Sequence, residues 1–246
     1  MEKQKKTVGV VLAEAAYGEN GKRLTLFTRD LGKVTAFANG AKKAKSPLLA
    51  ASQLFVFGNF ELYQGKNAYT LTGAEVIESF YPLRSNLWLT AYAMYLAELT
   101  LAFLQDGITG KRLLKLLYIS FEELVKEKIK PEQIRAVFEL KFLALAGYTP
   151  ELSCCIRCGR QENLNYFSPA DGGMICHFCA GKPEEKLAPA IYQAMAYVLE
   201  APVEKVFRFR LKTEYEYPFF TLMKKYTAHY LDYPLKSEQF LNEILS

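Results

Sequence analysis

The sequence predicts an α+β protein: an N-terminal β-barrel, then an α-helical domain with an inserted four-cysteine zinc module. Short alternating apolar segments separated by turns fill the first third, and helical periodicity dominates from residue 81 onward. Two Cys-x-x-Cys pairs interrupt the helical part. We therefore expect three domains: residues 1–80, residues 81–149 together with 182–246, and residues 150–181.

The first third of the chain contains five segments with strand character. The expected strands cover residues 8–12, 23–29, 33–39, 54–63 and 69–77. The turn Asp30-Leu31-Gly32 suits a three-residue connection of a β-hairpin because glycine stands at its end. Five short strands in so few residues favour a small closed barrel.

The remainder of the chain carries helix start and stop signals. Asn86 can cap a helix that runs to about Leu104, Pro131 suits the first turn of a later helix, and Gly147 suits its end. Further helices are expected around residues 113–124, 189–202 and 218–231, and from residue 237.

The charge of the chain is mildly basic and lies mostly in its first third. The 246 residues include 31 Lys+Arg and 26 Asp+Glu, a net charge of +5. Residues 1–80 alone hold 11 Lys+Arg against 7 Asp+Glu. Half of all residues are apolar, so the chain can bury a sizeable core.

Two apolar runs resemble targeting or membrane segments only superficially. Residues 8–13 follow N-terminal lysines but are too few for the core of a signal peptide. Residues 87–104 approach the length of a membrane span, but Glu98 and several polar residues interrupt them, so a buried helix is expected. Paired thiols without a secretion signal suit a reducing compartment, so we expect a cytoplasmic protein with no membrane contact.

The two Cys-x-x-Cys pairs, Cys155/Cys158 and Cys176/Cys179, are the most specific chemical signal in the sequence. Seventeen residues rich in turn formers separate them. Two such turns supply four soft ligands for one tetrahedral zinc ion. A site of four thiolates has no open coordination position, so the zinc would be structural and would fold a small module.

A redox dithiol and a disulfide pair are the alternative roles for these cysteines. A redox dithiol usually occurs once, at the start of a helix in a βαβ unit, and a disulfide pair is the other alternative. Cys154 could compete with Cys155 as a ligand, but only Cys155 gives the same spacing as the second pair. His177 lies between two ligand positions and is expected to be an exposed neighbour.

One face of the first predicted hairpin combines cations, hydroxyls and aromatic rings. If Arg29 pairs with Lys33, alternation places these side chains together: Arg23, Thr25, Phe27, Arg29, Lys33, Thr35, Phe37 and Asn39. In this register Phe27 lies opposite Thr35. The other face would form the barrel core with Leu24, Leu26, Val34 and Ala36. Cations track phosphates and rings stack on bases, so the first face suits single-stranded nucleic acid. The alternative is that Phe27 and Phe37 point inward.

A lysine-rich loop follows the hairpin. Lys42, Lys43 and Lys45 lie without any acidic neighbour between Gly40 and Pro47. Loops between the strands of small barrels commonly bind oligonucleotides, and contacts of lysine with phosphate are sequence-independent and salt-sensitive. The expected nucleic-acid-binding residues are Lys22, Arg23, Phe27, Arg29, Lys33, Phe37, Lys42, Lys43 and Lys45.

Several segments carry a family likeness, in the same order along the chain. They include residues 22–28 (KRLTLFT), 39–46 (NGAKKAKS), 75–80 (EVIESF), 146–152 (AGYTPEL), 167–173 (FSPADGG) and 234–237 (PLKS). With these segments the chain resembles the RecO family of bacterial recombination mediators. In many members a cation stands at the position of Asn39, and some members lack the metal cysteines, so zinc here rests on the spacing in this sequence.

The resemblance implies an OB-fold at the N-terminus and a zinc module inserted in a helical domain. It also implies binding of single- and double-stranded DNA without sequence specificity, annealing of complementary strands, and a location on the nucleoid. The implied partners are RecR and the acidic C-terminal tail of the single-strand-binding protein, and the implied outcome is loading of RecA.

No enzyme signature competes with this interpretation. The two histidines, His177 and His229, lie in no recognisable catalytic motif, and no phosphate-binding Gly-x-x-x-x-Gly-Lys-Ser/Thr loop is present. A zinc-dependent nuclease would need an open coordination position, which four thiolates do not leave. The alternative from another functional class is a protein-interaction scaffold with only incidental DNA contact.

Overall fold

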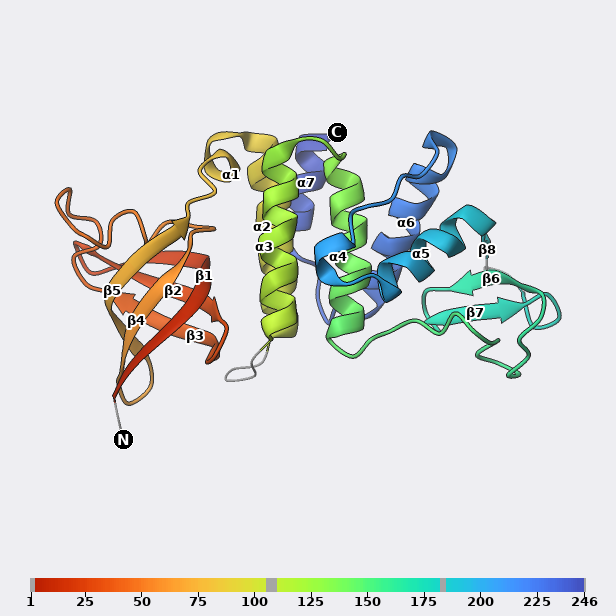
Figure 1. The fold of residues 1–246 in the computed structure, drawn as a ribbon, viewed down its shortest axis with the longest axis horizontal. Coiled ribbons are helices and arrows are strands. Elements are labelled where there is room, and N and C mark those ends of the chain that lie inside the picture. The colour runs from red at the N-terminus through yellow and green to blue at the C-terminus, as the bar shows by residue number, and fades with distance from the viewer. Residues whose placement is uncertain (1–2, 105–109, 182–184, 246) are drawn as a thin grey trace. The chain divides into compact units, whose positions relative to one another are not determined.

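The structure is a computed structural model that describes residues 3–104, 110–181 and 185–245. Figure 1 shows the order of its elements along the chain. Two compact units are present, one of Met1–Lys128 with Leu235–Ser246 and the other of Ile129–Pro234. This grouping by compactness differs from the three domains expected from the sequence, whose boundaries stay a prediction.

A closed five-stranded barrel begins the first unit and has the OB-fold (Figure 1). Its strands are β1 (Gln4–Tyr17), β2 (Gly21–Thr28), β3 (Gly32–Ala38), β4 (Phe57–Gln64) and β5 (Tyr69–Glu78). The order around the barrel is β1-β2-β3-β5-β4. The β3–β5 pair is parallel, and the other pairs are antiparallel. Alternate apolar side chains fill the interior, among them Leu24, Leu26, Val34 and Ala36, as the sequence predicted.

The register of the β2–β3 hairpin differs from the expected one by two residues. Phe27 lies opposite Lys33, whereas the expected register placed it opposite Thr35. The hairpin closes earlier because Thr28 pairs with Gly32, its hydroxyl donates to the Gly32 carbonyl, and Gly32 adopts a φ of 68°. Side chains alternate with a period of two, so a slip of two residues leaves each one on its expected face.

In the described part of the first unit, four helices accompany the barrel. They are α1 (Pro82–Ser85), α2 (Leu87–Phe103), α3 (Lys111–Lys126) and α7 (Lys236–Leu245). Asn86 caps α2, as predicted, because its side-chain oxygen accepts from two backbone N–H groups. Glu98, the one charge in this apolar helix, accepts hydrogen bonds from the backbone of Lys236 and Ser237 at the start of α7. Within the described residues, no helix is long and apolar enough to cross a membrane.

The second unit combines three longer helices with a small cysteine-bearing sheet. Its elements are α4 (Pro131–Leu145), β6 (Leu164–Ser168), β7 (Gly173–Cys176), β8 (Glu185–Lys186), α5 (Pro189–Glu200), η1 (Val203–Lys205) and α6 (Thr213–His229). The last of these helices begins before Pro218, the start expected from the sequence, and includes this proline in its interior. The buried Lys141 donates to the carbonyls of Leu199 and Ala201 at 2.7 Å and so caps the end of α5.

Candidate metal centre and nucleic-acid interface

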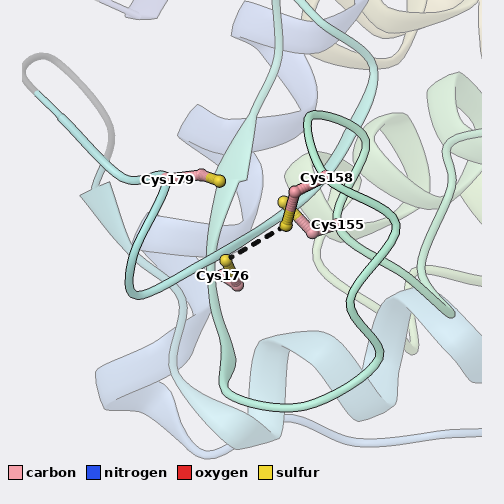
Figure 2. A group of neighbouring side chains, drawn as sticks. All are labelled: Cys155, Cys158, Cys176 and Cys179. Carbon is pink, nitrogen blue, oxygen red and sulfur yellow. Dashed lines mark hydrogen bonds between the residues drawn. The ribbon is translucent and has the colours of Figure 1, made fainter.

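Two tight turns bring the predicted cysteines together. In the first, the N–H of Gly159 donates to the carbonyl of Cys155, and Gly159 adopts the positive φ of 75° that favours glycine. In the second, at the end of β7, the carbonyl of Cys176 accepts from the N–H groups of Cys179 and Ala180. Each turn therefore aims two sulfur atoms at one point (Figure 2).

The geometry of the four sulfur atoms fits a tetrahedral metal ion. The sulfurs of Cys155, Cys158, Cys176 and Cys179 all lie within 4.8 Å of one another. The sulfurs of Cys158 and Cys176 are 3.7 Å apart (Figure 2). Four thiolates around one zinc ion, each about 2.3 Å from it, would lie about 3.8 Å from one another. This group can therefore hold one metal ion with little rearrangement.

Neighbouring groups shift the pKa values of Cys155 and Cys179 in opposite directions. Burial raises the pKa of Cys155. Hydrogen bonds from backbone N–H groups, of which that of Cys176 has the largest effect, outweigh burial and lower this pKa to about 6. The neighbouring thiols of Cys158 and Cys176 raise the pKa of Cys179 to about 12. Four sulfurs this close repel one another as anions, so a cation among them is needed to ionise all four.

The structure leaves the two neighbouring candidate ligands out of this group. All five cysteines are unbridged, and Cys154 does not belong to the cluster. His177 is also outside it, and its ring lies edge-on to the exposed ring of Phe178. The disulfide alternative is therefore not supported, and Cys155 is the member of its Cys-Cys pair that faces the other sulfurs.

Contacts within the second unit brace the cysteine module. Arg157 donates to the carbonyl of Cys179 at 2.9 Å and to Asp171 at 2.8 Å, so it links the two turns. The hydrogen bond from this guanidinium holds the pKa of Asp171 below its usual range. Phe167 of β6 packs edge-on against Tyr226 of α6, with ring centroids 5.8 Å apart.

The lysine loop of residues 40–47 is held at both ends and exposed between them. Ala41 and Leu48 are buried in the barrel core. The N–H of Lys42 donates to the carbonyl of Asn20, which fixes the loop beside the turn between β1 and β2. Lys42, Lys43 and Lys45 are exposed, and none has an ion-pair partner in the described part of the chain. The loop therefore presents three uncompensated cations.

An aromatic pair and an arginine lie at the same end of the barrel. The rings of Tyr17 and Phe37 are 4.5 Å apart, and Tyr17 is 50% exposed. Arg23 is exposed and lies opposite Phe37 in the register of the hairpin. The lysine-loop surface is defined here by these residues and the loop cations: Tyr17, Arg23, Phe37, Lys42, Lys43 and Lys45.

Tyr17 was absent from the sequence prediction. The first strand was expected to end at residue 12, but β1 continues to Tyr17 and pairs there with Gly21. Its second half, with small or acidic residues such as Ala13, Glu14 and Ala15, has little apolar alternation. The available signal was an aromatic residue immediately before the Gly-Glu-Asn turn that opens the next strand.

Two predicted binding residues are not available at the surface. Lys22 is 8% exposed, and its ammonium group bonds Glu14 at 2.7 Å and the carbonyl of Ser52 at 3.2 Å. Lys22 lies two residues before the buried Leu24 in β2, and side chains two residues apart point to the same side of a strand, so that of Lys22 points inward. Phe27 is fully buried because the chain at Gly110, just before α3, covers its ring. The prediction of surface contact is therefore corrected for both residues.

The remaining two predicted cations lie toward the other end of the hairpin. Arg29 forms an ion pair with Asp30 at 3.1 Å. The hydrogen bond from Arg29 is the main cause that lowers the pKa of the Asp30 carboxyl. Lys33 is half-buried at the start of β3. At about 3.3 Å per residue, the length of β3 separates them from the lysine loop by about 20 Å. Their contact with nucleic acid stays a prediction.

Comparison with known proteins decides the family. The family model described as Recombination protein O N terminal matches residues 1–80, and the one described as Recombination protein O C terminal matches residues 84–239. The chain belongs to the RecO family. Its two matched segments cover the barrel of the lysine-loop surface and the helices that carry the cysteine module.

Curated members of the family align with nearly the whole chain. The chain is 34% identical to the DNA repair protein RecO of Alkaliphilus metalliredigens, over 92% of this chain and 94% of that protein. It is 34% identical to the DNA repair protein RecO of Bacillus pumilus, over 98% of this chain and 94% of that protein. It is 33% identical to the DNA repair protein RecO of Clostridium acetobutylicum, over 97% of each chain.

Proposed function

We propose that the chain is a DNA-binding recombination mediator that acts in DNA repair and recombination. It binds single- and double-stranded DNA without sequence specificity through the lysine-loop surface. The observation that carries the proposal is the group of three uncompensated, exposed lysines beside the Tyr17–Phe37 ring pair, of which Tyr17 is exposed, on an OB-fold barrel. Lysine contacts to phosphate provide affinity, and rings stack on any base.

Charge neutralisation provides a mechanism for strand annealing. Two single strands repel each other through their phosphates, and bound cations lower this repulsion so that complementary bases can pair. The step needs no ATP and no catalytic residue, so the chain is proposed to act as a mediator and not as an enzyme. The four cysteines hold one structural zinc ion, which stabilises the module between α4 and α5.

The proposed partners follow from the family. Together with RecR, the chain helps to load RecA onto DNA that is coated with the single-strand-binding protein. It contacts the C-terminal tail of that protein, whose acidic character suits a basic partner. The proposed place of action is the nucleoid in the cytoplasm.

A strand-annealing assay tests the proposal. Two complementary oligonucleotides, with and without single-strand-binding protein, are mixed with the purified chain in the absence of ATP across a range of salt. We expect faster annealing at low salt and a steep loss as salt rises, because phosphate contacts release counterions. If the chain neither binds nor anneals strands at about 50 mM salt, where such contacts are strong, the scaffold alternative is favoured.

A further inference from the structure

A second row of cations lies in the second unit, in the segment that leads into α6. Arg208, Arg210 and Lys212 are exposed, whereas Phe209 and Leu211 between them are half-buried. Neighbouring side chains of an extended segment point to opposite sides. The segment therefore turns its apolar side toward the protein and its three cations toward solvent.

The core of the second unit holds this segment in place. The ring of Phe209 lies 5.4 Å from that of Tyr197 and 6.5 Å from that of Phe219. The carbonyl of Phe209 accepts a hydrogen bond from the side chain of Gln133. Val206, just before the segment, is fully buried. Because the backbone is anchored, the cations are positioned before any ligand arrives, which lowers the entropic cost of binding.

The charges of this segment are not compensated locally. Of the acids that follow it, Glu216 pairs with Lys130 at 2.5 Å. Glu214 accepts a hydrogen bond from the Tyr215 hydroxyl, which raises the pKa of that tyrosine. Among the described residues, none forms an ion pair with the three exposed cations. Three unpaired cations in five residues fit a linear polyanion.

We propose that residues 208–212 form a second binding surface for the phosphate backbone of nucleic acid, which holds the second strand during annealing. This inference rests on the proposed function. Annealing brings two polyanions together, and the lysine-loop surface accounts for the binding of only one of them. Tyr217, in the first turns of α6, is 77% exposed and adds a ring on which a base can stack.

The test removes the three charges and keeps a polar side chain at each position. The 208–212 variant combines Arg208→Gln, Arg210→Gln and Lys212→Gln. A matched control removes three other exposed lysines from outside both surfaces, with Lys128→Gln, Lys186→Gln and Lys236→Gln. Unchanged melting temperature and metal content show that each variant is folded.

We expect the annealing rate of the 208–212 variant on bare strands to fall at least tenfold below that of the control. In a chain that also lacks the charges of the lysine loop, the 208–212 changes should abolish the remaining binding of single strands. Before the 208–212 changes are added, that remaining binding should have a slope of log affinity against log salt of about −2, since each phosphate contact contributes about 0.7.

The inference would be overturned if the 208–212 variant anneals at the control rate. If that variant has also lost binding of a synthetic acidic peptide, the surface is assigned to a protein tail instead. Failure of the proposed function gives a different result. In that case, a variant without the lysine-loop charges would bind and anneal strands as well as wild type does.

Discussion

The three lysines of the loop give the sharpest quantitative prediction about DNA binding. The perturbation is the triple variant Lys42→Gln, Lys43→Gln and Lys45→Gln. All three side chains are exposed and without ion pairs among the described residues, so their loss leaves no partner unpaired and the fold should be unaffected. Any change in DNA binding can then be assigned to the lost charges.

The magnitude follows from counterion release. Each lysine that neutralises a phosphate of a single strand contributes about 0.7 to the slope of log affinity against log salt, so three lysines contribute about 2. Between about 50 and 200 mM salt, wild type should therefore lose about 20-fold more affinity than the variant. The weakening should be the same for all base sequences, because lysine reads charge and not base edges.

Fluorescence anisotropy with a labelled oligonucleotide of mixed sequence measures both quantities. The titration is repeated at several salt concentrations for wild type, the loop variant and the control variant with three other lysines replaced. An unchanged slope in the loop variant, or a slope change equal to that of the control, would refute the assignment of phosphate contacts to this loop.

Three further predictions concern single features of the structure. Tyr17→Ala should weaken single-strand binding by about 1–3 kcal/mol through lost base stacking and leave the salt slope unchanged; normal affinity in anisotropy titrations would contradict the role of this ring. Lys22→Met should destabilise the fold by about 1–3 kcal/mol in urea unfolding, because it leaves the buried carbonyl of Ser52 without its donor, and should not alter the salt slope; a reduced slope would instead restore Lys22 as a phosphate contact. Elemental analysis should find one zinc per chain in wild type and in Cys154→Ser, and none in Cys155→Ser/Cys158→Ser, whose second unit should also lose thermal stability; full metal content in the double variant would exclude these ligands.

The elements predicted from the sequence were those with a strong local cause. A Cys-x-x-Cys turn brings two sulfurs together through its own backbone, so the spacing of Cys155/Cys158 and Cys176/Cys179 was sufficient to predict the cluster. Alternation also placed Leu24 and its neighbours in the barrel core. This prediction survived an error of two residues in hairpin register, because side chains repeat with a period of two.

The binding surface depended more on distant parts of the chain. No local pattern shows that the chain at Gly110 covers Phe27, which lies more than 80 residues earlier. The pairing of Lys22 with Glu14 requires two strands in register, and the contact of Tyr17 with Phe37 requires three. Such contacts are decided by non-local packing, which strand propensity does not encode.

The sequence by itself therefore determined the order of the barrel strands and the longer helices, the four-cysteine cluster and the basic loop, because each depends on residues close together in the chain. Only the tertiary structure decided which cations and rings reach solvent. Exposure of a side chain is a property of everything packed around it, and it was this property that removed Lys22 and Phe27 from the surface and added Tyr17.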